Sequence, residues 1–346
     1  MLTRICLLIL WLGAAVSVAA AQPPSASRSA AALPSVQQRL AKVGADLYAG
    51  TSRPDAAIEE LKAILAIDPG LADAHMYLGM AYRMTGSEDL MGEARAELIQ
   101  ALALAPHLVP ARFVLAQLYL DLRRPAGARE TLTAGLAQHP AQPQLMALLG
   151  EAERQLGNPG RAVELARQVL AKEASFTQGR YYLALALLDG GQREEAIVEL
   201  ERVVRSGPKV ADAYLALGTA YLDAKRVDAA VEALREATAL DGSRPDARIA
   251  LARAYRSKGL LARADAELAL ARPRAVASAA SPLSQRQVEP DFHLELGLVR
   301  LRQGRLAAAA AAFERVLETE PDHEAATRHL AEVRKLRKAS AGKQKQ

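Results

Sequence analysis

Residues 211–244 read ADAYLALGTAYLDAKRVDAAVEALREATALDGSR, and the small and apolar side chains of this stretch fall on two stripes with helical spacing. The first stripe runs through Tyr214, Leu217, Gly218 and Tyr221. The second stripe runs through Ala230, Leu234 and Ala237. Two such stripes, joined by a short polar segment, predict a pair of helices that fold back on each other.

The same pattern recurs on both sides of this stretch at steps of 34 residues. Glycine or alanine returns at the position where a larger side chain would push the paired helices apart. This position is occupied by Gly79, Ala116, Gly150, Ala184, Gly218, Ala252 and Gly297. A two-helix unit of this length buries its apolar stripes only when a neighbouring unit stacks on it. The sequence therefore predicts an all-helical stack of repeats.

Turn and end signals agree with this register. Glycine, which adopts a left-handed conformation without strain, recurs between the two helices at Gly86, Gly157, Gly191, Gly259 and Gly304. Arg123 and Lys225 occupy that turn in two other units. Proline follows the second helix at Pro69, Pro106, Pro140, Pro208 and Pro321, where a helix has to end.

The pattern Tyr214-x2-Leu217-Gly218-x2-Tyr221, followed by Ala230-x3-Leu234, resembles the tetratricopeptide repeat (TPR) family. Tyr214 stands where the family often has Trp, and Gly242 stands where it often has Pro. The resemblance implies an all-α fold, a right-handed superhelical solenoid of TPR units that ends in a capping helix. It also implies a binding protein whose partner lies in a concave groove.

In the TPR family the first helix of each unit lines the groove, and its fifth and ninth positions commonly contact the partner. Carried over by register, these positions give the candidate binding residues Met76, Met80, Phe113, Gln117, Tyr181, Leu185, Leu215 and Ile249. The largest apolar side chains lie in the N-terminal half, so we expect the partner there. The lysine and asparagine that clamp a terminal carboxylate in some family members are missing from these positions. The alternative is that these side chains pack against the neighbouring unit.

Residues 1–21 have the features of a signal peptide: Arg4, then an apolar run that begins at Ile5, then three alanines before Gln22. We expect cleavage after Ala21. An uncleaved anchor is the alternative, although the apolar run is short for a membrane span of about 20 residues. The only cysteine, Cys6, lies inside this run, so the mature chain is expected to hold no disulfide. Residues 22–35, rich in Pro, Ser and Ala, predict a flexible linker.

The TPR array is expected over residues 36–272, with a degenerate first repeat at 36–69. Six further units start at 72, 109, 143, 177, 211 and 245. Residues 273–289 break the register and predict a flexible loop. A final TPR with its capping helix covers 290–338, and residues 339–346 are a basic tail.

The formal net charge of +5 comes from the C-terminal end of the chain. Basic residues without an intervening acid are Arg334, Lys335, Arg337, Lys338, Lys343 and Lys345. One interpretation is a surface that contacts anionic lipid or nucleic acid. The other is a solvated helix end whose cations complement the helix dipole.

The sequence holds no recognisable set of catalytic residues. His323 and His329 are six residues apart, instead of the four that would place both on one helix face as metal ligands. The remaining histidines are isolated in different units at His75, His107, His139 and His293. We therefore predict no enzyme activity, no cofactor and no metal site.

The leading functional hypothesis is an exported, non-enzymatic TPR scaffold of a bacterial periplasm or the secreted space, which binds a protein or peptide segment in its groove. No nucleic acid is expected as a partner, and membrane contact is expected only through the basic tail or an uncleaved signal. One alternative is an accessory subunit of an envelope machine for polysaccharide synthesis or export. Another is an anionic-surface binder that acts through the tail.

Overall fold

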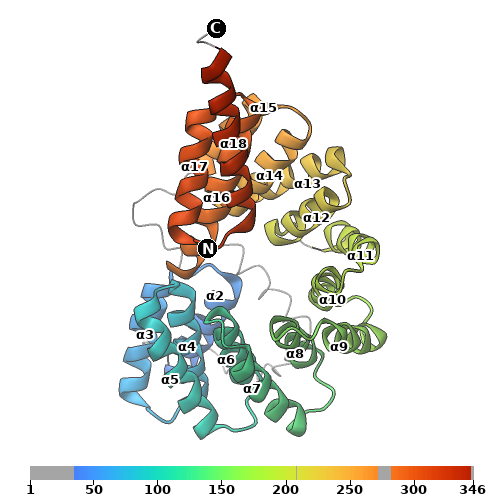
Figure 1. Ribbon diagram of the computed structural model, residues 1–346. Coiled ribbons are helices and arrows are strands. Elements are labelled where there is room, and N and C mark those ends of the chain that lie inside the picture. The colour runs from blue at the N-terminus through green and yellow to red at the C-terminus, as the bar shows by residue number, and fades with distance from the viewer. Residues whose placement is uncertain (1–34, 208, 272–281, 344–346) are drawn as a thin grey trace, which may run out of the picture. The chain divides into compact units, whose positions relative to one another are not determined.

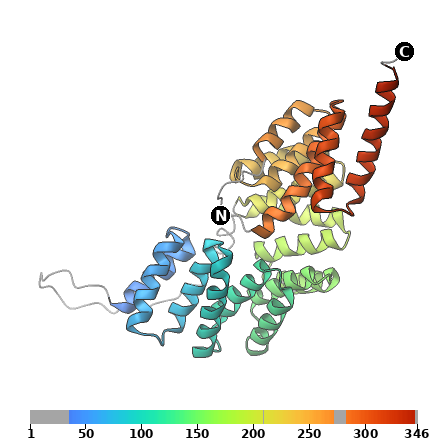
Figure 2. The same cartoon turned by 60° about the vertical axis from the view of Figure 1, so that its left-hand side comes forward.

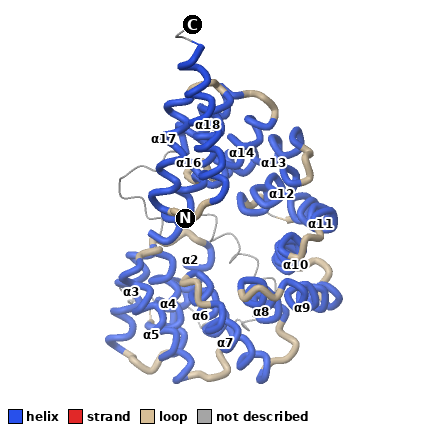
Figure 3. Tube along the Cα trace, viewed as in Figure 1, coloured by secondary structure: helices blue, strands red, loops and turns tan. Residues whose placement is uncertain are grey.

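The computed structural model describes residues 35–207, 209–271 and 282–343 of the chain. Within these residues the regular elements are α-helices and there is no strand (Figure 3). Two compact units divide the chain, unit 1 at residues 1–186 and unit 2 at residues 187–346. The expected signal peptide, all but the last residue of the expected linker and residues 273–281 lie outside the described part.

Unit 1 consists of helix pairs that stack on one another (Figure 1). Its first helices are α2 (Val36–Ala49), α4 (Ala72–Thr85), α6 (Val109–Asp121), α8 (Pro143–Gln155) and α10 (Thr177–Asp189), inside which the division between the units falls. Its second helices are α3 (Pro54–Ile67), α5 (Glu88–Leu104), α7 (Pro125–Gln138) and α9 (Pro159–Lys172). Each second helix from α3 to α7 packs against its own first helix and against the next one. A core that runs without interruption from Leu47 to Leu118 results.

Unit 2 repeats this arrangement. It begins with the second helix α11 (Arg193–Ser206), which packs on the first helix α12 (Ala211–Asp223). The pairs that follow are formed by α12 with α13 (Val227–Leu240), α14 (Pro245–Ser257) with α15 (Leu261–Ala271) and α16 (Pro282–Arg302) with α17 (Leu306–Thr319). Helix α18 (Glu324–Lys343) packs on α17 and continues past its end (Figure 2). The predicted all-α class with stacked helix pairs and a C-terminal capping helix is confirmed.

The predicted close-approach position explains why the pairs pack so tightly. A Cβ added at Gly218 would collide with the Leu234 side chain of the paired helix, and Leu234 is itself fully buried. The equivalent Gly150 has more room, since an added Cβ would lie 3.4 Å from the carbonyl oxygen of Ala162. The glycine requirement is therefore strict in the first complete pair of unit 2 and relaxed in the last complete pair of unit 1.

The two units without a turn glycine keep the same backbone conformation. Arg123 and Lys225 have φ angles of 56° and 60°, in the left-handed region that the turn glycines also occupy. Non-glycine residues adopt this conformation at a cost of about 1–2 kcal/mol. The stacking of the flanking helices holds these residues in place despite that cost.

A hydrogen bond that recurs in four units, not anticipated from the sequence, joins the loop before a first helix to that helix. The residue at the fourth position of a first helix contacts the carbonyl oxygen six residues earlier, just after the preceding second helix. The contacts are His75 Nε2 with Pro69 at 3.1 Å, Arg112 with Pro106 at 2.8 Å, Arg180 with Ala174 at 2.6 Å and Arg248 with Gly242 at 3.0 Å. Loop carbonyl groups left without a partner by the end of the helix are satisfied in this way.

The expected loop at 273–289 is wrong for its second half. Helix α16 begins at Pro282, so residues 282–289 extend the first helix of the last pair. Pro282 suits a helix start because a residue there needs no backbone donor. Pro290, the first residue of the expected final unit, lies inside the helix. The capping helix also continues beyond residue 338, to Lys343, into the expected basic tail.

Candidate functional site

The first helices of neighbouring pairs contact each other directly. In unit 1 these contacts join α2 to α4, α4 to α6 and α6 to α8; in unit 2 they join α12 to α14 and α14 to α16. Each unit therefore presents one continuous surface made of first helices (Figure 1). We call this surface the first-helix face of unit 1 or of unit 2. All eight residues predicted from the sequence lie on these helices.

Five of the eight predicted residues belong to the core. Their exposed fractions are 2% for Met76, 0% for Met80, 6% for Phe113, 8% for Gln117 and 3% for Ile249. Phe113, for example, belongs to the apolar cluster that contains Leu132 and Leu145 of the following helices. The physical reason is the close spacing of the first helices, which pack their fifth and ninth side chains against each other. These five side chains therefore offer almost no surface to a partner. Their burial agrees with the alternative interpretation, in which they pack against the neighbouring unit.

The other three predicted residues, Tyr181, Leu185 and Leu215, are half-buried. Tyr181 lies beside Tyr182, with ring centroids 6.0 Å apart. Leu215 packs against the core cluster of unit 2 that contains Ile249 and Leu251. The structure thus places Tyr181 and Leu185 on the face of unit 1 and Leu215 on the face of unit 2.

Charges on the face of unit 1 are paired with one another. Arg83 of α4 donates to Asp121 of α6 at 2.8 Å, which links two successive first helices. In α8, Glu151 accepts hydrogen bonds at 2.8 Å from Arg154 and Gln155. With two cations and two carboxylates in these pairs, the face of unit 1 carries no net charge from them.

Two uncharged polar groups lie between these pairs. Gln178 donates to the Tyr182 hydroxyl at 3.0 Å. Burial, and next the carboxylate of Glu151, raise the pKa of Tyr182 above its usual range, so the ring stays neutral. Gln117 is different, because its buried Oε1 has no hydrogen-bond partner in the described residues. A buried acceptor without a partner is unfavourable and rare in folded proteins.

The face of unit 2 contains an ionic cluster that we did not anticipate. Glu295 of α16 is only 2% exposed, and its carboxylate accepts hydrogen bonds from Arg256 of α14 through Nε and, at 3.2 Å, through a terminal nitrogen. Arg253 of α14 lies 3.7 Å from the same carboxylate. Arg253 is at the ninth position of α14, whereas the break in register before α16 hides its neighbour Glu295 from the repeat pattern.

The described residues offer no candidate for catalysis by a metal. No three His, Cys, Asp or Glu side chains gather closely enough among them to hold an ion. Across the same part of the chain, every helix is too short or too polar to cross a bilayer.

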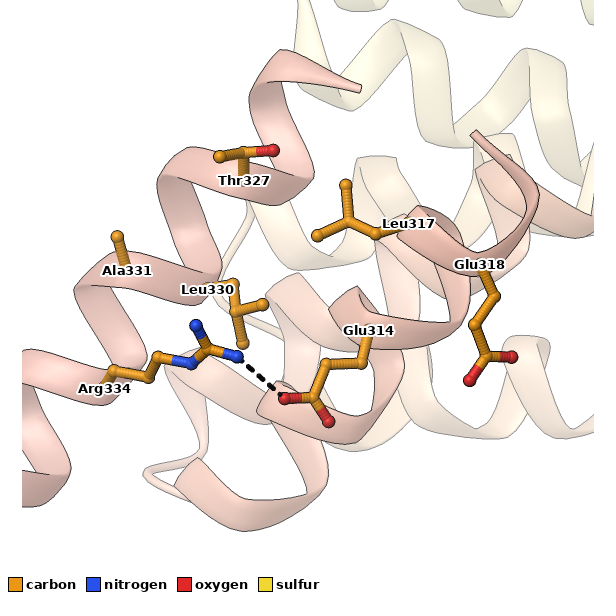
Figure 4. A pocket seen from close by; sticks show the side chains of 7 residues that line it. All are labelled: Glu314, Leu317, Glu318, Thr327, Leu330, Ala331 and Arg334. Atoms are coloured by element: carbon orange, nitrogen blue, oxygen red, sulfur yellow. Dashed lines mark hydrogen bonds and ion pairs between the residues drawn. The ribbon is translucent and has the colours of Figure 1, made fainter. Parts of the chain in front are cut away.

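A shallow groove of about 570 Å³ lies between α17 and α18 (Figure 4). It is lined by Glu314, Leu317, Glu318, Thr327, Leu330, Ala331 and Arg334. Arg334 reaches across it to Glu314 at 3.2 Å, as the dashed line in Figure 4 shows. This ion pair joins the capping helix α18 to α17.

Comparison with known proteins agrees with this geometry. Matches to the family described as Tetratricopeptide repeat cover residues 43–108, 113–176, 181–245, 215–280, 261–324 and 294–334. No curated protein matches the sequence.

Among solved structures, the APC/C hetero-tetramer Cut9–Hcn1 contains a chain with a TM-score of 0.66 and 16% identity. The similarity covers 86% of this chain but only 55% of that one. A dimer of human IFIT1 with PPP-AAAA gives a TM-score of 0.65 at 16% identity, over 88% of this chain and 73% of that chain. Identity at this level reflects a shared fold and no more. The family matches span most of the sequence, and this chain belongs to the tetratricopeptide repeat family.

Proposed function

We propose that the protein is a non-enzymatic scaffold that binds a protein or peptide segment on its first-helix faces. The observation that carries the proposal is the row of half-buried side chains on those faces, Tyr181 and Leu185 in unit 1 and Leu215 in unit 2. Each has part of its apolar surface in contact with solvent, and Leu215 also packs against the core cluster of unit 2. Large side chains held in this way lose little conformational freedom when a partner covers them.

Photo-crosslinking tests where the partner binds. A photoreactive amino acid at position 181 or 215 is expected to crosslink a partner, which is then identified by mass spectrometry. The matched controls place it at Glu130 and Glu232, exposed residues of the second helices α7 and α13. Crosslinking that is as strong at the controls as at the first-helix positions would contradict the proposal.

We further propose that the scaffold is exported, on the basis of the signal-peptide features of residues 1–21. The expected mature N-terminus is Gln22. N-terminal sequencing of protein from the envelope fraction decides this point, since an intact Met1 chain in membranes would replace export with anchoring. A crosslinked partner that synthesises or exports polysaccharide would favour the accessory-subunit alternative.

The basic C-terminus supports a second candidate function, binding to an anionic surface. On α18 the side chains of Lys335, Arg337 and Lys338 are exposed, and Leu336 between them is 43% exposed. Cations around an exposed leucine suit a lipid headgroup layer. Deletion of residues 334–346 separates the candidates, because it abolishes binding to anionic vesicles and leaves crosslinking at position 181 unchanged.

A further inference from the structure

The ionic cluster on the face of unit 2 has more positive than negative charge. It contains two guanidinium groups, of Arg253 and Arg256, and one carboxylate, of Glu295. Glu295 is almost fully buried, and a buried carboxylate needs a cation with directed hydrogen bonds. Arg256 supplies both, because two of its nitrogens donate to the two oxygens of Glu295.

Arg253 makes no hydrogen bond inside this cluster. Its Nε lies 3.7 Å from Glu295, which is within ion-pair range but too far for a hydrogen bond. No hydrogen bond of Arg253 occurs among the described residues, and its side chain is 39% exposed, against 17% for Arg256. Its planar fork of donors therefore faces solvent on the surface where we place the partner. Such a fork matches the geometry of a carboxylate.

The preceding first helix, α12, carries Leu215 and Thr219 at its fifth and ninth positions. Thr219, at the ninth position of the preceding first helix, uses its hydroxyl to donate to the carbonyl oxygen of Leu215 at 2.8 Å. Leu215 itself, at the fifth position of that helix, is half-buried against the apolar cluster of unit 2. Helices α12 and α14 contact each other. A half-buried leucine and an exposed guanidinium are thus presented on adjacent first helices.

We propose that unit 2 recognises the side-chain carboxylate of an acidic residue in an extended peptide segment, through Arg253, with an apolar residue of the same segment on Leu215. This proposal rests on the function proposed above and names the chemistry of the partner. Glu295 and Arg256 act as positioning residues, since the 3.7 Å contact with Glu295 limits where the Arg253 fork can lie. On the face of unit 1, the guanidinium groups of Arg83 and Arg154 each donate a hydrogen bond to a carboxylate.

The test uses an array of short peptides with acetylated and amidated ends, probed with the full-length protein. The expected result is enrichment of Glu or Asp at one position, next to an apolar residue. In Arg253→Gln this preference disappears, and the affinity for the best acidic peptide, measured by fluorescence anisotropy, falls roughly tenfold, as loss of a charge-assisted hydrogen bond predicts. Arg235→Gln, on the exposed surface of α13, changes the net charge equally and keeps the preference.

The outcomes separate the two proposals. Binding of peptides without a preference for acidic residues overturns the role of Arg253 and leaves the scaffold function standing. Absence of peptide binding together with uniform crosslinking overturns both. A second array with free C-termini shows the source of the carboxylate, and binding restricted to that array overturns the side-chain proposal. If Arg253→Gln melts below the wild type, Arg253→Lys is used, which is expected to retain the acidic preference with weaker binding.

Discussion

The first-helix faces of the two units are built from the same repeat but are filled differently. In unit 1, Met76, Met80 and Phe113 at the fifth and ninth positions are buried, and the charges of the two ion pairs described above balance. In unit 2, the corresponding positions include Leu215, Thr219 and Arg253, which remain partly accessible. The comparison teaches that register assigns a side chain to the row that faces the groove, whereas the packing around that side chain decides whether a partner could reach it.

This difference gives the largest expected effect at Phe113. Phe113→Ala removes a 6% exposed ring from the core of unit 1 and is expected to cost about 3–5 kcal/mol of unfolding free energy. Tyr181→Ala, at a half-buried ring on the same face, is expected to cost less and to weaken crosslinking to the partner. Denaturant unfolding followed by circular dichroism compares the two midpoints. Equal stability losses would mean that both residues are equally part of the core.

The ion pairs between first helices are expected to contribute unequally to the stability of the two units. In unit 2, Glu295→Gln leaves the Arg256 guanidinium, which is 17% exposed, without its counter-ion, and about 3 kcal/mol of stability is expected to be lost. In unit 1, Asp121→Asn leaves Arg83, which is 10% exposed, without its counter-ion, but Asp121 itself is 26% exposed, against 2% for Glu295, so a smaller loss of about 1–3 kcal/mol is expected. The same denaturant titration measures both variants. A larger loss for Asp121→Asn would contradict the contrast between the two faces.

Particular residues show which features of the fold and of the candidate site could be predicted from the sequence. The helix pairs and their starts were predictable, because apolar periodicity and small residues such as Gly218 report on contacts inside each unit. How deeply Met76 and Phe113 are buried could not be predicted, because the repeat register assigns a residue to a face of its helix. It does not show how closely the next helix covers that face. The pairing of Arg253 and Arg256 with Glu295 was hidden by the register break before α16. The helical state of residues 282–289 could not be predicted, because Pro282 and the polar residues after it are typical of a loop.

The close-approach glycines provide a smaller and more local test. Gly218→Leu in unit 2 is expected to cost about 1–3 kcal/mol, since the fully buried Leu234 has no space to move aside. Gly150→Ala in unit 1 meets only the carbonyl oxygen of Ala162 at 3.4 Å, and the helix propensity of alanine favours it by up to about 1 kcal/mol. Thermal melting should therefore move in opposite directions for the two variants. An unchanged melting temperature for Gly218→Leu would count against the close packing of α12 on α13.

The smallest effect concerns the alkaline stability of unit 2, where the Tyr221 hydroxyl donates to Glu201 of α11 at 2.7 Å. Burial, followed by this hydrogen bond to a carboxylate, raises the pKa of Tyr221 to about 12 from its usual value near 10. Because the folded-state pKa is the higher one, the contribution to stability is complete below about pH 10 and is lost as the pH rises towards 12.

Tyr221→Phe cannot ionise, so the stability difference between wild type and variant should shrink over this interval. In unit 1 the Tyr182 hydroxyl accepts a hydrogen bond from the neutral Gln178, while burial and next the Glu151 carboxylate raise its pKa, so Tyr182→Phe gives the comparison for a tyrosine without a hydrogen bond to a carboxylate. Denaturant midpoints measured from neutral pH to pH 12 provide the comparison, and a constant difference between wild type and Tyr221→Phe would show that Tyr221 keeps its ordinary pKa in the folded protein.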